Sequence, residues 1–366
     1  MSRPKVREDV GLMQGYHSPQ LDVETRLNTN EAPEPPPEAF TERLAAATRS
    51  VDWNRYPDRS AARLRAAIAD AESPAAGWSI HADNIFVANG SNEVLQTVCL
   101  AFGGEGRKVA TFEPTYALHS HIAKVVGTAV LSAPRGPDFG LDMGTVEELV
   151  SSEKPIITFL CSPNNPTGGV DSPEEIATVL GIVESVGGLL VVDEAYGQFA
   201  VNSAMELVSE ERSLVVTRTF SKTWSAAALR LGYLVGPRWL VADLDKVVLP
   251  YHLDAMKQLA GEVAIEFEDE MKKRVAFIVE ERGRLVSEMG DLELTQWPTG
   301  SNFILFRPGT PKSAGPSGDE VWQRLVDDGV LIRNCASWPG LEDCLRVTIG
   351  TRQENDQFLA ALAKAL

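Results

Sequence analysis

The sequence predicts an α/β fold with a large domain built on a mostly parallel seven-stranded sheet and a smaller α+β domain. Two observations lead to this prediction. Between residues 84 and 236, short apolar runs alternate with helical periodicity, which is typical of a parallel sheet covered by helices on both faces. After a helical stretch over roughly 252–287, strand-like and helix-like runs follow in mixed order. A chain of 366 residues is also long enough for two domains.

The N-terminal part is predicted as an extended arm followed by two helices. The run EAPEPPPEAF (31–40) is rich in proline, which fixes φ and removes hydrogen-bond donors, so regular structure cannot begin within its first residues. Residues 38–49 and 60–72 show the periodicity of amphipathic helices. The polar turn between these two helices presents Tyr56.

Seven short apolar runs predict the strands of the larger sheet. In a sheet of this kind ligands bind at the carboxyl ends of the strands, so the loops that follow them are the place to look for functional side chains. The predicted strands are 85–89, 108–112, 128–133, 155–161, 188–196, 213–220 and 233–236.

The smaller domain is predicted from the runs that follow the long helical stretch. We divide the chain into an N-terminal arm (1–37), a large domain (38–260) and a small domain (261–366), and leave open whether residues 38–75 pack with the small domain. The runs of the small domain are strands 302–306, 330–333 and 344–350 and helices 319–328 and 352–366.

Charge and composition exclude several classes of partner. The chain has 34 basic and 51 acidic residues, for a net charge of −17, which repels phosphate backbones and anionic membrane surfaces. No uninterrupted apolar run approaches the roughly 18 residues of a membrane span, and the N-terminus has no signal-peptide pattern. None of the four cysteines forms a C-x-x-C pair. We therefore expect no nucleic-acid or membrane partner, no metal site and a cytoplasmic location.

Four polar segments follow predicted strands, and each has an ordinary structural interpretation. SPNNPTG contains Asn165 and is compatible with a tight turn, while Asp193 in VVDEAY can simply cap a turn. Lys222 in TFSK can be an exposed turn lysine. Ser91 and Asn92 in ANGSNE can be an ordinary helix N-cap. None of these segments alone decides between a structural and a functional role.

Together the four segments point to pyridoxal 5'-phosphate (PLP). Lys222 is a candidate Schiff-base lysine, because burial and the nearby Arg230 lower a lysine pKa and favour the neutral amine. Asp193 is able to keep a heterocyclic nitrogen protonated by ion pairing, and Tyr196 is able to donate to a phenolate oxygen. The remaining polar groups are hydroxyl side chains, an arginine and the first residues of a predicted helix, all of which suit a phosphate. They are Ser91, Asn92, Thr219, Ser221 and Arg230.

Motifs along nearly the whole chain resemble the fold-type I PLP-dependent aminotransferases, specifically the histidinol-phosphate aminotransferase branch. The most specific are TRTFSK (217–222) and LRLGY (229–233), with RLNTNEAP (26–33), NRYPD (54–58) and LRVTIG (345–350) in the same order as in that family. The resemblance implies that Lys222 bonds PLP and Asp193 pairs with the pyridine nitrogen, while Lys222, Asp193 and Tyr196 carry the catalysis. Its implied cofactor contacts are Ser91, Asn92, Tyr116 stacked on the ring, Asn165, Tyr196, Thr219, Ser221, Arg230 and, from the other subunit of a homodimer, Tyr56.

The substrate side is predicted mainly from two arginines of the small domain. Arg333 and Arg346 either form surface ion pairs or bind a carboxylate or phosphate through bidentate hydrogen bonds from their guanidinium groups. By resemblance, Arg346 takes carboxylate and phosphate groups with help from Arg333, Asn165 also faces the substrate, and Tyr16 covers it. Ser225 and Ala228 depart from the family, since glycines are common at both positions.

The resemblance implies transamination of histidinol phosphate with 2-oxoglutarate, giving imidazole acetol phosphate and glutamate in histidine biosynthesis. Two alternatives on the same scaffold are an aromatic-amino-acid aminotransferase and a threonine-phosphate decarboxylase, because they share most cofactor residues. A non-enzymatic PLP-sensing module is a further alternative, but it would normally bring a basic DNA-binding segment, which an acidic chain with a short N-terminus does not provide.

Overall fold

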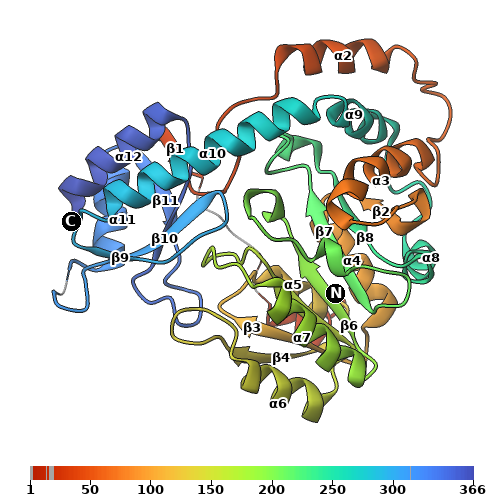
Figure 1. Cartoon of the computed structure of the whole chain (residues 1–366), viewed down its shortest axis with the longest axis horizontal. Helices are drawn as coiled ribbons and strands as arrows, with labels where there is room; N and C mark the ends of the chain where they lie inside the picture. Colours follow the sequence, from red (N-terminus) through yellow and green to blue (C-terminus); the bar gives the residue numbers. More distant parts are fainter. Residues whose placement is uncertain (1–2, 14, 16–19, 314) are drawn as a thin grey trace.

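The computed structural model describes residues 3–13, 15, 20–313 and 315–366 and builds them around two sheets. The larger sheet has seven strands in the order β2-β8-β7-β6-β5-β3-β4, and the smaller has five in the order β1-β11-β12-β10-β9. Figure 1 shows the smaller sheet with α11 and α12 on the left and the larger sheet on the right, with α10 reaching from one side to the other. The predicted α/β architecture is confirmed.

The seven predicted strands of the larger sheet are all present. Strands β3 to β7 run parallel to one another, while β8 is antiparallel to both of its neighbours, β7 and β2, so the sheet is mostly parallel as predicted. The central strands are buried along their whole length, because helices cover both faces. The bounds are β2 (Ile85–Ala88), β3 (Lys108–Glu113), β4 (Ala129–Pro134), β5 (Ile157–Cys161), β6 (Leu189–Asp193), β7 (Leu214–Thr219) and β8 (Gly232–Val235).

Two of the helices that cover this sheet begin at side chains that cap their first turn. Ser172 caps α7 and forms a reciprocal capping box with Glu175, and Asp142 caps α6 by accepting from the Thr145 amide. The covering helices are α4 (Ser91–Phe102), α5 (Leu118–Val125), α6 (Met143–Glu153), α7 (Pro173–Ser185) and α8 (Arg238–Val247), and the 3-10 turns are η1 (Ala82–Asn84), η2 (Gly197–Phe199), η3 (Ala204–Leu207) and η4 (Ala227–Leu229).

The smaller sheet contains two strands of three residues each that we did not predict, β1 (Thr25–Leu27) and β9 (Leu294–Gln296). Strand β1 pairs in parallel with β11, so part of the predicted arm belongs to this sheet; a strand of three residues is too short to show a periodic pattern. The limits at 37 and 260 stay predictions. The elements are β1 (Thr25–Leu27), β9 (Leu294–Gln296), β10 (Phe303–Pro308), β11 (Val330–Asn334), β12 (Leu345–Thr348), α10 (Glu268–Met289), α11 (Gly318–Asp327) and α12 (Arg352–Ala365).

The long helical stretch predicted over 252–287 is divided in two. Helix α9 (Ala255–Ile265) ends before Phe267, whose ring packs edge-on against Phe40 of α2 at 6.0 Å between centroids, and α10 begins one residue later. The break is therefore decided by tertiary packing, which helical periodicity does not report. The remaining helices are α1 (Glu8–Gly11), α2 (Glu38–Thr48) and α3 (Ala62–Ala76), of which α2 and α3 contact α9.

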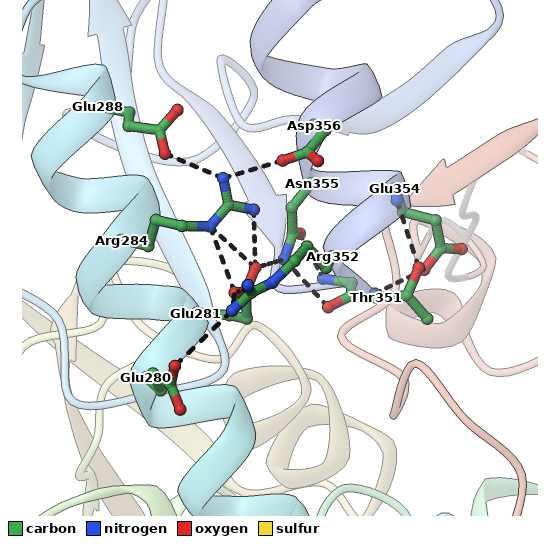
Figure 2. A network of polar contacts seen from close by, with 10 residues as sticks. Glu280, Glu281, Arg284, Glu288, Thr351, Arg352, Glu354, Asn355 and Asp356 are labelled. Atoms are coloured by element: carbon green, nitrogen blue, oxygen red, sulfur yellow. Dashed lines mark hydrogen bonds and ion pairs between the residues drawn. The ribbon is translucent and has the colours of Figure 1, made fainter.

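A buried carboxylate joins α10 to α12 (Figure 2). Glu281 is fully buried and accepts hydrogen bonds from Arg284 (2.8 Å), Arg352 (3.0 Å) and Asn355 (3.0 Å). The Asn355 side chain also bonds the amide and carbonyl of Gly350, at the carboxyl end of β12. Because a buried charge is tolerated only when it is paired, this network holds the end of β12 against both helices.

Candidate active site

The predicted site residues converge on one cavity of about 440 Å³ between the two sheets. Residues at or after the carboxyl ends of β5, β6 and β7 line it, together with Arg333 of β11 and Arg346 of β12. This is the edge at which ligands bind in parallel sheets. The predicted residues that line it are Ser91, Asn92, Tyr116, Asn165, Asp193, Tyr196, Thr219, Ser221, Lys222, Arg230, Arg333 and Arg346.

Two predicted residues are not placed in this cavity. Tyr56 is 79% exposed, and its ring stacks on Tyr251 with 4.5 Å between centroids, away from the cavity lining. The prediction that Tyr56 serves a partner's site therefore needs a second subunit. Tyr16 lies outside the described residues.

Lys222 lies just after β7 and reaches into the cavity. Its Nζ donates to the carbonyl oxygen of Thr29 at 3.1 Å and lies 5.7 Å from the ring centroid of Tyr196. Burial, followed by the positive charge of Arg346, lowers the pKa of Lys222 from 10.5 to about 8. A substantial fraction of this amine is therefore neutral near physiological pH, as a nucleophile or a general base must be.

Asp193 ends β6 as a buried carboxylate with a donor for each oxygen. Oδ1 accepts from the Thr217 hydroxyl and from the Ala195 amide, both at 3.1 Å. Oδ2 lies 3.0 Å from His119 Nε2, whose ring stacks on Phe159 with 4.8 Å between centroids. These contacts fix the orientation of the carboxylate at the cavity wall.

His119 is a residue whose role the sequence analysis missed. The sequence analysis assigned it no site role, but it is buried and contacts Asp193 directly. Tyr116 precedes α5, and a hydrogen bond from the His119 amide to the Tyr116 carbonyl (3.0 Å) closes the turn between the two residues. The two rings meet edge to face at 5.4 Å between centroids.

An anion-binding cup is formed where α4 begins. Gly90 precedes the helix with φ 85°, and a Cβ atom there would lie only 2.7 Å from Arg230 Nη2. The glycine therefore lets the guanidinium lie against the helix N-terminus, where free amides and the helix dipole favour a negative charge. Arg230 Nη1 also donates to the Ser221 hydroxyl at 3.3 Å, and that hydroxyl lies 3.0 Å from Thr219 Oγ1.

Arg346 and Tyr196 are held in the cavity lining by hydrogen bonds. Arg346 Nη1 donates to Asn165 Oδ1, Nη2 donates to the Asn28 carbonyl at 3.1 Å, and Nε has no partner among the described residues. The Tyr196 hydroxyl accepts from Asn30 Nδ2 at 2.9 Å. Burial, above all, raises the pKa of Tyr196, so the phenol keeps its proton.

Arg333 and Arg346 are directly opposite each other on β11 and β12. The Arg333 guanidinium lies 5.0 Å from the ring centroid of Trp338, which also lines the cavity. The sequence analysis did not single out Trp338, because it lies in a loop without a recognisable pattern. The cavity is thus lined by two guanidinium groups from the smaller sheet in addition to that of Arg230.

The family model described as aminotransferase class I and II matches residues 23–362, which is nearly the whole chain. The chain belongs to this family. The predicted membership of the fold-type I PLP-dependent aminotransferases is thereby confirmed, and the protein is an enzyme of the aminotransferase type.

Individual relatives of this aminotransferase cover almost its whole length. It is 41% identical to a histidinol-phosphate aminotransferase of Frankia casuarinae over 99% of this chain and 90% of the relative. It is 40% identical to a histidinol-phosphate aminotransferase of Corynebacterium efficiens over 98% of this chain and 94% of the relative. A histidinol-phosphate aminotransferase from Sinorhizobium meliloti, solved in complex with pyridoxal-5'-phosphate, has the same fold, with a TM-score of 0.86, 21% identity, and coverage of 100% and 98% of the two chains.

The aminotransferase carries backbone strain at one of the two positions where its family commonly has glycine. Ser225 has φ 52°, in the left-handed region that glycine occupies without cost, and its hydroxyl is buried without a partner among the described residues. Ala228 lies in η4 and lines the cavity. The loop after Lys222 therefore keeps a conformation suited to glycine at Ser225 although the glycine is missing.

In residues 3–13, 15, 20–313 and 315–366, no helix is both long and apolar enough to cross a membrane. Within the same ranges, no three or more His, Cys, Asp or Glu side chains are grouped as a metal site would require.

Proposed function

We propose that this aminotransferase binds PLP in the cavity and transfers the amino group of histidinol phosphate to 2-oxoglutarate. The observation that carries the proposal is that two groups suited to anions, the Arg230 cup and the Arg333–Arg346 pair, line one cavity together with Lys222 and Asp193. Two relatives named histidinol-phosphate aminotransferase at 40% and 41% identity support the choice of amine.

The residues present fit PLP in size, charge and donor set. The cup at the start of α4 suits its phosphate, and the buried carboxylate of Asp193 suits its protonated pyridine nitrogen. Asn165 and Tyr196 would bond the ring's phenolate oxygen, and Tyr116 would stack on the ring. When bound, PLP supplies an aromatic ring that accepts electrons from the carbon that loses its proton.

Lys222 is proposed to act first as the covalent anchor of the cofactor and then as the proton carrier. Its lowered pKa lets the freed amine accept a proton from the substrate α-carbon and return it elsewhere along the reaction path. Asp193 keeps a negative charge beside the ring nitrogen, and the protonated phenol of Tyr196 donates toward the ring oxygen.

The pH dependence of cofactor attachment tests the role of Lys222. The amine in the apoprotein is expected to bond PLP faster as the pH rises and to level off above about pH 8, because only the neutral amine attacks and burial lowers the Lys222 pKa to about 8. Stopped-flow absorbance at several pH values measures this rate. A rate that keeps rising through pH 10, as for an ordinary lysine, would contradict the assignment.

The substrate proposal predicts different effects of two arginine substitutions. Arg333→Ala is expected to lower kcat/KM for histidinol phosphate by roughly 10- to 150-fold, which is the typical cost of losing the charge-assisted hydrogen bonds of one guanidinium group. The kcat/KM for phenylalanine is expected to stay nearly unchanged. Arg346→Ala is expected to damage both amines and the glutamate half-reaction, since Arg346 also orients Asn165. Steady-state kinetics with each amine measure these effects.

Arg307→Ala is the matched control for Arg333→Ala. Arg307 is an exposed arginine of β10 in the same sheet, with its guanidinium 5.8 Å from the ring centroid of Trp297, and it does not line the cavity. Equal damage to both amines by Arg333→Ala, or a wild-type preference for phenylalanine, would favour the aromatic aminotransferase instead. Including threonine phosphate in the same screen tests the decarboxylase alternative.

We also propose that the active unit is a homodimer with shared sites in the cytoplasm. Tyr56 and Tyr251 form a stacked aromatic pair exposed on the surface of a single chain, which supports an interface there. All four cysteines are free, which supports a reducing compartment.

Mixing two inactive variants tests the shared site. Lys222→Ala subunits mixed with Tyr56→Phe subunits are expected to regain activity, because each heterodimer contains one site with both residues intact. Activity after subunit exchange, corrected for the residual activity of each variant alone, measures the recovery. Absence of recovery despite proven exchange would disprove the shared site.

A further inference from the structure

The tripeptide 28–30, directly after β1, contacts three of the side chains that the proposed mechanism uses. The sequence analysis placed this tripeptide in the N-terminal arm and assigned it no role. All three of its residues line the cavity. The contacts are Asn28 O with Arg346 Nη2 (3.1 Å), Thr29 O with Lys222 Nζ (3.1 Å) and Asn30 Nδ2 with Tyr196 Oη (2.9 Å).

Asn30 is fixed in place from several sides. It is buried and has φ 55°, in the left-handed region that asparagine tolerates better than most residues. Its amide nitrogen donates to Thr348 Oγ1 at 3.0 Å, and its carbonyl accepts from Asn302 Nδ2 at 3.2 Å. The side chain of Asn30 therefore starts from a well-defined backbone position.

The hydrogen bonds around Asn30 have one consistent direction. The Thr348 hydroxyl accepts from the Asn30 amide and donates its own proton to Asn30 Oδ1 at 3.1 Å. The Asn30 NH₂ group therefore points toward Tyr196 and donates a hydrogen bond to the phenol oxygen. Because the phenol oxygen accepts on this side, its own proton is free to point into the cavity.

We infer that Asn30 is a positioning residue that keeps the Tyr196 proton aimed into the cavity, toward the ring oxygen of the cofactor. The inference rests on the proposed function only in requiring PLP at Lys222. Arg346, Asp193 and Cys161 are the other ionisable groups near the Tyr196 phenol, and substituting Asn30 leaves all of them and Lys222 in place.

The experiment follows the visible absorbance of bound PLP as a function of pH. In the holoenzyme, Asn30→Ala is expected to raise the spectroscopic pKa of the bound cofactor by about 0.5 to 1, because a weaker donation from Tyr196 destabilises the anionic ring oxygen. Asn30→Gly, which accepts a positive φ, provides a second variant if alanine prevents folding. Thr348→Val, which removes the hydroxyl that orients the Asn30 amide, is expected to shift the pKa in the same direction.

A double variant tests whether the effect passes through Tyr196. Tyr196→Phe is expected to raise the spectroscopic pKa by itself, and adding Asn30→Ala to it is expected to produce no further rise. Thr25→Val is the matched control, since it removes a buried hydroxyl bonded to Gln357 at 2.6 Å in the same segment but outside the cavity lining. It is expected to leave the spectroscopic pKa unchanged.

The outcomes separate this inference from the proposed function. The inference is overturned if the Asn30 variants leave the spectroscopic pKa unchanged. It is also overturned if Asn30→Ala raises that pKa further in the Tyr196→Phe background. A fall in the pKa also overturns it, because the Asn30 oxygen would then face the phenol. A wild-type protein that binds PLP without a pH-dependent band at Lys222 overturns the proposed function together with the inference.

Discussion

Lys222→Ala is expected to lower the rate of the amine half-reaction by about 10,000-fold or more, because the lysine is both the covalent anchor and the proton carrier. Among the residues that the structure describes, the substitution removes one hydrogen bond, from Nζ to the Thr29 carbonyl, so the protein should still fold. Sodium borohydride reduces the carbon–nitrogen bond between a lysine and PLP and makes it permanent. The wild-type chain is expected to retain about one cofactor per chain after reduction and denaturation, and the variant none.

Lys272→Ala is the control for the lysine prediction. Lys272 is an exposed residue of α10 whose ion pair with Glu268 lies on the surface, so its loss is expected to change neither labelling nor rate. Fixation of cofactor to Lys222→Ala at the wild-type stoichiometry would show that another lysine is the anchor.

Asp193→Asn is expected to slow the half-reaction by about 100- to 1000-fold with only a modest loss of cofactor affinity. The amide oxygen of asparagine can still accept from Thr217 and Ala195, and its NH₂ group faces His119 Nε2, so the local geometry is kept. The negative charge that holds the proton on the pyridine nitrogen is lost. Single-turnover absorbance with histidinol phosphate measures the rate.

Asp171→Asn is the control for Asp193→Asn. It shows whether the loss of any buried carboxylate charge slows the reaction, or only the loss of the Asp193 charge. Asp171 is 4% exposed and pairs with Arg135 at 3.1 Å, outside the cavity lining. Its substitution is expected to lower the melting temperature, because Arg135 is left buried with one ion-pair partner fewer, but to leave the half-reaction rate nearly unchanged. A near-normal rate in Asp193→Asn would refute the role given to Asp193.

The parts of the fold that depend on local chemistry were predictable. The seven strands of the larger sheet appeared as apolar runs, since strands buried on both faces have no polar alternation. Ligands bind at the carboxyl ends of parallel strands, and this rule predicted from the sequence that Asn165, Asp193 and Lys222 share one site.

Contacts between distant segments were not predictable from the same signals. Strand β1 is recognisable only through its pairing with β11, and the break between α9 and α10 depends on a ring from α2. His119 gains its role from Asp193, 74 residues away, and Asn30 gains its role from Tyr196, 166 residues away. Neither pairing leaves a periodic pattern in the chain.

By itself, the sequence determined the parallel architecture, the family and most of the residues around the cavity, because periodicity, turn chemistry and motif spacing are local properties of the chain. Only the tertiary structure decided how those residues are oriented. The Asp193 carboxylate is oriented by His119, the Tyr196 phenol by Asn30, and the Arg333 guanidinium by Trp338. Orientation depends on which hydrogen-bond and packing partners meet in space. Those partners come from different elements, so they are defined only once the chain has folded.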